Sequence, residues 1–154
     1  MRNIIAVSLV ALLAGCNATT SDSSPGNTAL HSPQESSGLA SLNRFPPKYP
    51  EKEAMNGKEG CATIEYTVGS DRKVSDINVI EASDAVFAAE ARKVVSRWSW
   101  QTVSEDAFPS PVKFQTRFEY CLEEGNGNCL ASALAARTQC SGDDMIASVG
   151  MKIK

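Results

Sequence analysis

Histidine is almost absent from this sequence, because the chain of 154 residues contains only His31. His31 lies among serine, proline and glycine residues, where we expect it to sit in water. One histidine in that setting argues against Cys–His or Ser–His nucleophilic chemistry and against a zinc site that needs imidazole. The carboxylates of Glu65 and Asp76 face outward, as solvated surface groups do, and offer no argument for a catalytic base. The sequence therefore predicts no catalytic residue, no cofactor and no enzymatic activity.

An excess of positive charge and a C-x-x-C motif are also lacking. The formal net charge is −3, and no basic patch follows the chain, so nucleic acid is not an expected partner. Five cysteines are present, but their gaps are irregular. Without C-x-x-C, a zinc site made of thiolates and a redox-active cysteine pair are both disfavoured. We therefore predict no metal site.

Long hydrophobic runs are missing as well. The longest apolar stretch, Ile4 to Ala14, would reach about 16 Å as a helix, well short of the ~30 Å hydrocarbon core of a bilayer. With Arg2 as a positive n-region, it is typical of a signal peptide and not of a transmembrane span. The sequence therefore predicts export.

The end of this run, Leu13-Ala14-Gly15-Cys16, resembles the lipobox of bacterial lipoproteins. The resemblance implies cleavage of residues 1–15 and a lipid on the thiol of Cys16. Several acyl chains on one residue would anchor the protein firmly to a membrane. Asn17, which is not an aspartate, favours the outer membrane over the inner one by the same resemblance. We expect a periplasmic, lipid-anchored protein.

A polar stretch follows the lipobox. Residues 16–44 are rich in serine, threonine, asparagine, proline and glycine and show no periodicity, which predicts a flexible tether; a loop packed on the domain is the alternative. Regular structure is expected from Phe45. Pro50 suits the first helical position and Gly57 a left-handed stop, so a short helix of about two turns is predicted between them.

Three strands and a longer helix are predicted next. Cys61 to Val68 alternates between apolar and polar residues, as a half-buried strand does. Val74 to Glu81 is a second strand, with Ile77 and Val79 facing inward and a bulge near Val74. Ser83 or Asp84 caps a helix, and the third strand runs from Val112 to Leu122. The apolar stripe of the helix comprises Phe87, Ala91, Val94, Val95 and Trp98.

This order predicts an α+β fold in residues 45–124: a three-stranded antiparallel sheet packed on one main helix, preceded by a short N-terminal helix. A C-terminal extension, residues 125–154, follows the break at Gly125-Asn126-Gly127-Asn128. Within it, residues 129–140 predict a short helix. Residues 145–153 alternate weakly and could form a fourth strand.

The cysteines test this arrangement, because four remain after Cys16 and allow three pairings. Cys61 opens the first strand and Cys121 closes the third, and both face outward. If these strands are antiparallel neighbours, a Cys61–Cys121 bridge is expected. Cys129 and Cys140 would then form a second bridge that staples the C-terminal extension to itself.

From Tyr49 to Leu122 the sequence resembles the periplasmic C-terminal domain of the TonB family. Tyr49-Pro50, with Gly57 and Gly60, matches the opening motif of that family, and Trp98-Ser99-Trp100 matches its W-x-aromatic close. Asp71 and Val74 fall at its D-G-x-V turn, where Arg72 replaces the glycine. Since arginine does not easily take a positive φ, we expect this turn to differ locally.

The resemblance implies recognition by backbone: an extended peptide of an outer-membrane transporter or another envelope protein lies beside the third strand and extends the sheet. The edge residues would be Lys113, Gln115, Arg117 and Glu119. The alternatives are a structural envelope lipoprotein whose residues 145–153 close that edge, and a divergent accessory energy transducer. Pairing of two copies by a sheet edge, as a homodimer, also stays open.

Overall fold

A computed structural model describes residues 42–152. The signal peptide, Cys16 and nearly all of the tether predicted from the sequence lie outside these residues, as do positions 153–154. The elements are α2 (Glu51–Met55), β1 (Gly60–Val68), β2 (Val74–Ala82), α3 (Ala85–Val95), β3 (Val112–Glu123), α4 (Ala131–Ala135) and β4 (Met145–Met151), with 3₁₀ turns at Trp100–Thr102 and Glu105–Ala107. No helix in this part of the chain is both long and apolar enough to cross a bilayer.

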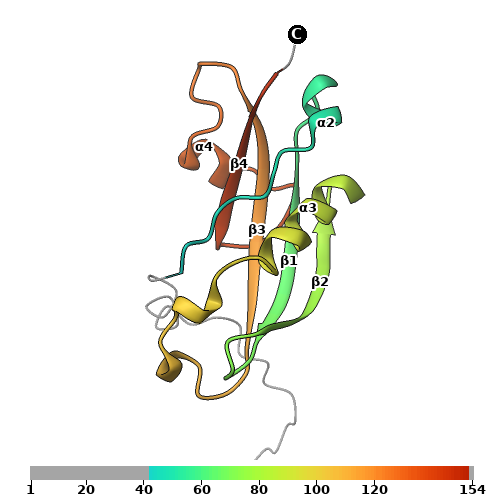
Figure 1. The fold of residues 1–154 in the computed structure, drawn as a ribbon. Coiled ribbons are helices and arrows are strands. Elements are labelled where there is room, and N and C mark those ends of the chain that lie inside the picture. The colour runs from blue at the N-terminus through green and yellow to red at the C-terminus, as the bar shows by residue number, and fades with distance from the viewer. Residues whose placement is uncertain (1–41, 153–154) are drawn as a thin grey trace, which may run out of the picture.

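The strands form one mixed sheet in the order β2-β1-β3-β4 (Figure 1). β1 pairs with β2 and with β3 in antiparallel fashion, whereas β4 runs parallel to β3. The α+β class and the single main helix are therefore confirmed, but a three-stranded antiparallel sheet is wrong, because a fourth strand joins it. This strand comes from the weakly alternating stretch near the C-terminus.

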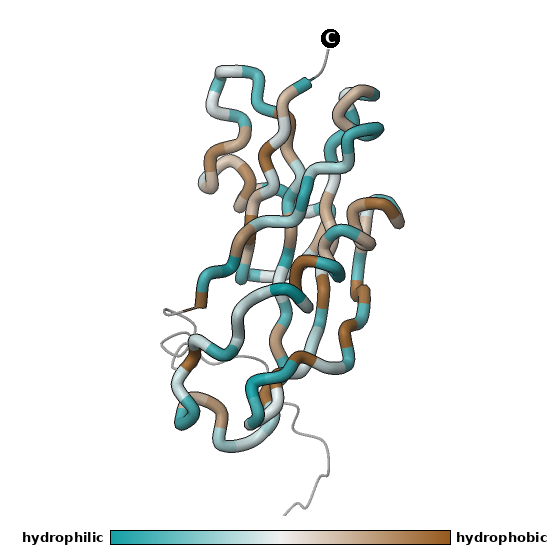
Figure 2. The backbone as a smooth tube through the Cα atoms, in the orientation of Figure 1, coloured by the Kyte–Doolittle hydropathy of each residue, from teal (hydrophilic) through white to brown (hydrophobic). Residues whose placement is uncertain are grey.

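The main core lies between α3 and one face of the sheet. Asp84 caps the N-terminus of α3, because its carboxylate accepts a hydrogen bond from the backbone N–H of Val86 at 3.0 Å. Its predicted apolar stripe is buried, and the inward-facing residues of β1 and β3 pack against it. Figure 2 shows how apolar and polar residues alternate along the strands. In β1 and β3 the apolar positions of this alternation are those that face α3.

The β1–β2 hairpin departs from the prediction at two points. Arg72 does take a positive φ, 60°, and its guanidinium bonds to Gln101 O and Val103 O and pairs with Glu105. The β1–β2 pairing has two register shifts: one lies between Ser75 and Asn78, close to the predicted bulge, and the other lies between Val79 and Glu81. Ile77 packs against the core as expected, whereas Val79 is 42% exposed.

The C-terminal extension covers the opposite face of the sheet. A second, smaller core forms there around Cys121, Cys129 and Leu134, against which Met145 and Ala147 pack. α4 is only five residues long, shorter than the helix predicted over residues 129–140. The chain therefore has three layers at this end of the sheet: α3, the strands, and the extension.

Candidate partner-binding edge

β3 is the strand on which the predicted binding edge depends. Its inward residues are buried against α3, including Phe114, Phe118 and Tyr120. Its register with β1 is unbroken from Val112 to Tyr120, so side chains alternate regularly between the two faces of the sheet. The strand is therefore held firmly on its β1 side, and any partner has to approach from the other side.

β4 occupies only part of that other side. It pairs with β3 from Arg117 to Glu123, in a register where Arg117 lies opposite Met145. The N–H of Arg117 donates to Asp144 O at 2.8 Å, which shows that odd-numbered residues of β3 direct their backbone groups toward β4. Lys113 and Gln115 share that direction. Among residues 42–152, no strand pairs with them on this side.

Asp144, immediately before β4, fixes the point at which β4 begins to pair with β3. Its carboxylate accepts hydrogen bonds from Arg44 Nη1 at 2.5 Å and from Thr116 Oγ1 at 2.7 Å. The Thr116 hydroxyl also lies 3.1 Å from the buried Tyr66 hydroxyl. These bonds join the start of β4 to β3 and to the N-terminal segment, so β4 begins beside Arg117 and does not extend further along β3.

The segment that precedes α2 contacts the C-terminal half of β4. Ser148 is buried, and its hydroxyl donates to Pro47 O at 2.9 Å. A Cβ built on Gly150 would lie 2.8 Å from the ring of Tyr49, so only glycine permits this approach. The segment that precedes α2 crosses in front of β3 and β4 in Figure 1.

The four residues predicted for the edge divide into two pairs. The structure leaves Lys113 exposed and Gln115 partly exposed, and the Lys113 ammonium lies 3.0 Å from the Glu65 carboxylate. Arg117 and Glu119 are buried beneath the C-terminal extension, with 7% and 1% of their surface exposed. The predicted edge is therefore open only over residues 112–116.

Arg117 fastens the extension to the sheet. Its guanidinium donates to the carbonyl oxygens of Arg137 and Cys140 at 3.0 and 3.2 Å. Its Nε lies 3.6 Å from Glu119 Oε1, and neither of these two atoms has a hydrogen-bond partner. Burial raises the pKa of Glu119, although the nearby Arg117 and Arg137 guanidinium groups act in the opposite direction.

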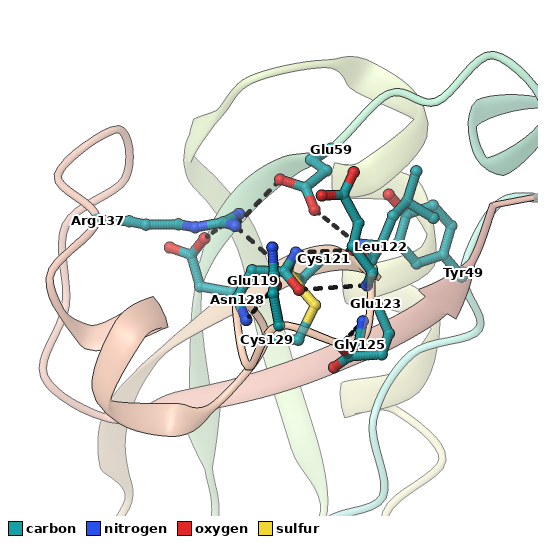
Figure 3. The surroundings of a disulfide bond; sticks show 12 residues. Tyr49, Glu59, Glu119, Cys121, Leu122, Glu123, Gly125, Asn128, Cys129 and Arg137 are labelled. Atoms are coloured by element: carbon teal, nitrogen blue, oxygen red, sulfur yellow. Dashed lines mark hydrogen bonds and ion pairs between the residues drawn. A yellow bond between two sulfur atoms is a disulfide. The ribbon is translucent and has the colours of Figure 1, made fainter.

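Arg137 lies between two carboxylates (Figure 3). Its Nη2 donates to Glu59 Oε2 at 3.0 Å, and its Nη1 lies 4.0 Å from Glu119 Oε2. Glu59 in turn accepts a hydrogen bond from the backbone N–H of Leu122 at 2.6 Å. These contacts tie the loop after α4 to the end of β3.

Two disulfides complete the attachment, but not in the predicted pairing. The bridges are Cys61–Cys140 and Cys121–Cys129, which corrects Cys61–Cys121 and Cys129–Cys140. Cys61 and Cys121 do face the same side of neighbouring antiparallel strands. However, Cys61 lies opposite Glu119, two residues from Cys121 along β3. That diagonal separation is about 7–8 Å at Cα, beyond the usual reach of a disulfide.

The described residues bring together one group of potential metal ligands: Glu59, Cys121 and Cys129. The two sulfur atoms are joined in a disulfide, so neither is the thiolate that zinc requires. The cluster therefore holds a covalent bridge and an ion pair, and we assign it no metal.

The residues that hold β4 in place beside β3 were not identified from the sequence. Neither Asp144 nor Ser148 was predicted from the sequence to have a partner. Their partners, Arg44 and Pro47, lie about a hundred residues earlier in the chain. Only the weak alternation after Met145 signalled that this segment joins the sheet.

Comparison with known proteins places this sheet in a family. The family described as "Gram-negative bacterial TonB protein C-terminal" matches residues 46–122. Protein TonB of Yersinia enterocolitica is 25% identical over 81 residues, which covers 52% of this chain and 32% of that protein. Protein TonB of Pseudomonas aeruginosa is 30% identical over 95 residues, which covers 54% of this chain and 28% of that protein. The chain thus spans about a third of the length of these relatives.

Two solved structures are similar in part. The solution NMR structure of the Pseudomonas aeruginosa TonB CTD is 22% identical and has a TM-score of 0.42, covering 52% of this chain and 85% of that one. That of the Helicobacter pylori TonB CTD is 20% identical with a TM-score of 0.38, covering 56% of this chain and 83% of that one. Because both TM-scores are below 0.5, the assignment rests on the sequence matches. The family match spans half of the 154 residues, and the chain therefore belongs to the TonB C-terminal domain family.

Proposed function

We propose that this protein is a lipid-anchored periplasmic module that docks a peptide of an outer-membrane transporter, or of another envelope protein, by β-strand addition. The added strand lies along residues 112–116 of β3. One observation carries the proposal: β4 begins opposite Arg117 and leaves the outward backbone groups of Lys113 and Gln115 without a strand partner among residues 42–152. A link to TonB-dependent transport follows from the family.

The open stretch suits a short peptide. An exposed row of N–H and C=O groups gives affinity to an added strand, and pockets for alternate side chains give specificity. Five residues of β3 extend over about 17 Å, so the bound segment would be about five residues long. The start of β4 at Met145, opposite Arg117, sets one limit of this site.

A structural role is the second candidate, because β4 covers β3 from Arg117 to Glu123. In this case the extension acts only to close the edge, and the domain is a stable envelope module without a peptide partner. The covered stretch includes Arg117 and Glu119, so neither side chain would contact a partner unless the extension came away from the sheet.

Capture in intact cells separates the two candidates. A photoreactive residue at position 113 is combined with Gln115→Pro or with its matched control, Gln115→Ala. Proline removes the outward N–H but is tolerated at a sheet edge, whereas alanine keeps the N–H. We expect position 113 to capture one envelope protein in the wild type and in Gln115→Ala, and at least about tenfold less in Gln115→Pro. A photoreactive residue at Asn78, on β2, controls for chance proximity.

Two results would contradict strand addition at this site. Equal capture in Gln115→Pro and Gln115→Ala would mean that the N–H of residue 115 is not used. No capture at position 113 in any variant would favour the structural role. Circular dichroism melts of both variants confirm that the sheet is intact in each.

The lipid anchor has a separate test. Replacing Cys16 with serine removes the thiol that would carry the lipid, so we expect Cys16→Ser to leave the membrane fraction while the wild type stays in it. Density separation of the two membranes then shows whether the wild type lies in the outer membrane, as proposed. A Cys16→Ser protein that stays fully membrane-bound would contradict the anchor.

A further inference from the structure

The chain contains two Asn-Gly pairs, Asn56-Gly57 and Asn126-Gly127, and the fold holds them differently. In such a pair the amide nitrogen of the glycine can attack the side-chain carbonyl carbon of the asparagine, since glycine has no Cβ to hinder the approach. The two groups belong to adjacent residues, so the reaction is intramolecular and needs no enzyme. Whether it occurs depends on how the fold holds the nitrogen and the side chain.

The first pair, Asn56-Gly57, is held in an unreactive arrangement. Asn56 is the C-cap of α2 and has helical backbone angles, φ −80° and ψ −2°. The N–H of Gly57 donates to Ala54 O at 3.1 Å, so this nitrogen is already bonded to the last turn of the helix. Attack by the Gly57 nitrogen would break that bond and open the end of α2.

The second pair, Asn126-Gly127, lies in the loop between β3 and α4, which projects from one end of the sheet (Figure 1). Asn126 is exposed to solvent. Within residues 42–152, neither the N–H of Gly127 nor the side-chain Nδ2 of Asn126 donates a hydrogen bond. In the described part of the chain, no bond has therefore to be broken for this nitrogen to attack or for Nδ2 to leave.

The side chain of Asn126 is also folded toward the nitrogen that would attack it. Its Oδ1 accepts a hydrogen bond from the backbone N–H of Asn128 at 3.0 Å. Because this bond spans residue 127, it holds the carboxamide close to the Gly127 amide. The same N–H stabilises the negative charge that develops on Oδ1 during the attack, as an oxyanion hole does. Asn128 is itself fixed, since its Nδ2 donates to Leu122 O at 2.8 Å.

We propose that Asn126 is a site of spontaneous covalent modification, at which the Gly127 nitrogen closes a succinimide ring on the Asn126 side chain. The Gly127 nitrogen loses its proton and bonds to Cγ of Asn126, while Nδ2 takes up a proton and leaves as ammonia. Water then opens the ring at either of its carbonyl groups, which gives aspartate or isoaspartate at position 126. The net reaction consumes one water molecule and releases one ammonia molecule.

This modification changes the charge of the loop but leaves the C-terminal extension attached. A carboxylate at position 126 adds to those of Glu123 and Glu124. The loop lies within the ring closed by Cys121–Cys129, so both of its ends stay fixed. The modified form should therefore accumulate with the age of the protein while the fold is kept. The site lies beyond the opposite end of β3 from residues 112–116 and does not rest on the proposed docking function.

The test compares the two asparagines within one molecule. Purified full-length protein with its disulfides intact is incubated at pH 7.5, and both sites are followed by peptide mass spectrometry. We expect Asn126 to convert at least about tenfold faster than Asn56, with isoaspartate among its products. The control is the same protein reduced and unfolded in urea, where the two rates should agree within about threefold because neither pair is held by the fold.

Variants at position 126 complete the test. Asn126→Gln keeps the amide but requires a larger ring, so the site should stay unmodified. Asn126→Asp reproduces one product, and we expect it to keep the Tm of the wild type and the same capture at position 113. Equal rates at Asn56 and Asn126 in the folded protein, or conversion of Asn126 only after unfolding, would overturn the proposal. A large fall in Tm for Asn126→Asp would contradict the expectation that the modified protein stays folded.

Discussion

Glu119 is the residue whose chemistry depends most on the C-terminal extension. It is 1% exposed, and its Oε1 atom has no hydrogen-bond partner. Desolvation raises its pKa above the ordinary value of 4.5, since Arg117 and Arg137 compensate for the burial only in part. A raised pKa in the folded state means that folding favours the neutral carboxyl group. Stability from this group is therefore fully present below the pKa of the unfolded chain and is lost as the pH rises through the folded pKa.

Glu119→Gln keeps the shape of the side chain and removes its ionisation. We expect the urea midpoint of this variant to equal or exceed that of the wild type at pH 7.5, because the variant has no charge to bury. At pH 4 the wild-type carboxyl group is largely neutral, so the advantage of the variant should disappear. Urea titrations at both pH values measure the difference.

A suitable control is Glu124→Gln, which removes an exposed carboxylate close to the same strand and should change the midpoint little at either pH. A Glu119→Gln variant that loses more stability at pH 7.5 than at pH 4 would show the opposite balance. In that case the attraction between Glu119 and Arg117 would outweigh the burial of the carboxylate.

Arg72 shows how a single side chain can change a local preference. A positive φ is unfavourable for any residue with a Cβ, and a different turn was predicted at Arg72 for this reason. In the structure the backbone accepts φ 60° while the guanidinium bonds to the 3₁₀ segment, including an ion pair of 3.0 Å with Glu105. These contacts lie about thirty residues away in sequence, so they could not enter a local prediction.

At the scale of elements, α4 is short and gains its stability from packing. Five residues are too few for a helix to be stable in water on its own. Leu134, fully buried, is the side chain by which α4 reaches the second core, whereas Leu130, just before the helix, is 62% exposed. The position of the extension on the sheet therefore depends on one leucine as well as on the disulfides.

Leu134→Ala should destabilise the domain by about 2–4 kcal/mol, because the cavity adds to the loss of apolar burial. The matched control, Leu130→Ala, makes the same chemical change at an exposed site and should alter the free energy of unfolding by less than about 0.5 kcal/mol. Chemical denaturation under oxidising conditions measures both. Equal effects of the two substitutions would contradict the second core.

The disulfide pairing also depends on how two elements, β1 and β3, are aligned. Strand alternation correctly placed Cys61 and Cys121 on one face of two antiparallel neighbours. Alternation fixes the face of a residue but not its register, and a shift of two residues keeps the face unchanged. Register was decided by Cys61 lying opposite Glu119, which left Cys121 to pair with Cys129 in the following loop.

At the scale of the whole molecule, the Cys61–Cys140 bridge joins the family domain to the extension. It links residues 79 apart, whereas Cys121–Cys129 links residues 8 apart. In the chain-entropy model the long bridge contributes about 4.5 kcal/mol and the short one about 2.5 kcal/mol. Because the family match ends at residue 122, β4 and both disulfide partners after β3 are features outside the matched region. The family acts in transport and is not enzymatic, which confirms the prediction that the chain is not an enzyme.

The sequence by itself determined the strands and the helix whose apolar residues recur on one face. Alternation defined β1 and β3, the stripe on α3 defined the helix and its buried face, and the opening and closing motifs indicated the family. Each of these signals is local, because it depends on periods of two or 3.6 residues or on short motifs. Strand order, the disulfide partners and the extent of the open edge were decided only in the tertiary structure. The physical reason is that they depend on contacts such as Arg44–Asp144 and Ser148–Pro47, whose members are brought together only when the whole sheet is formed.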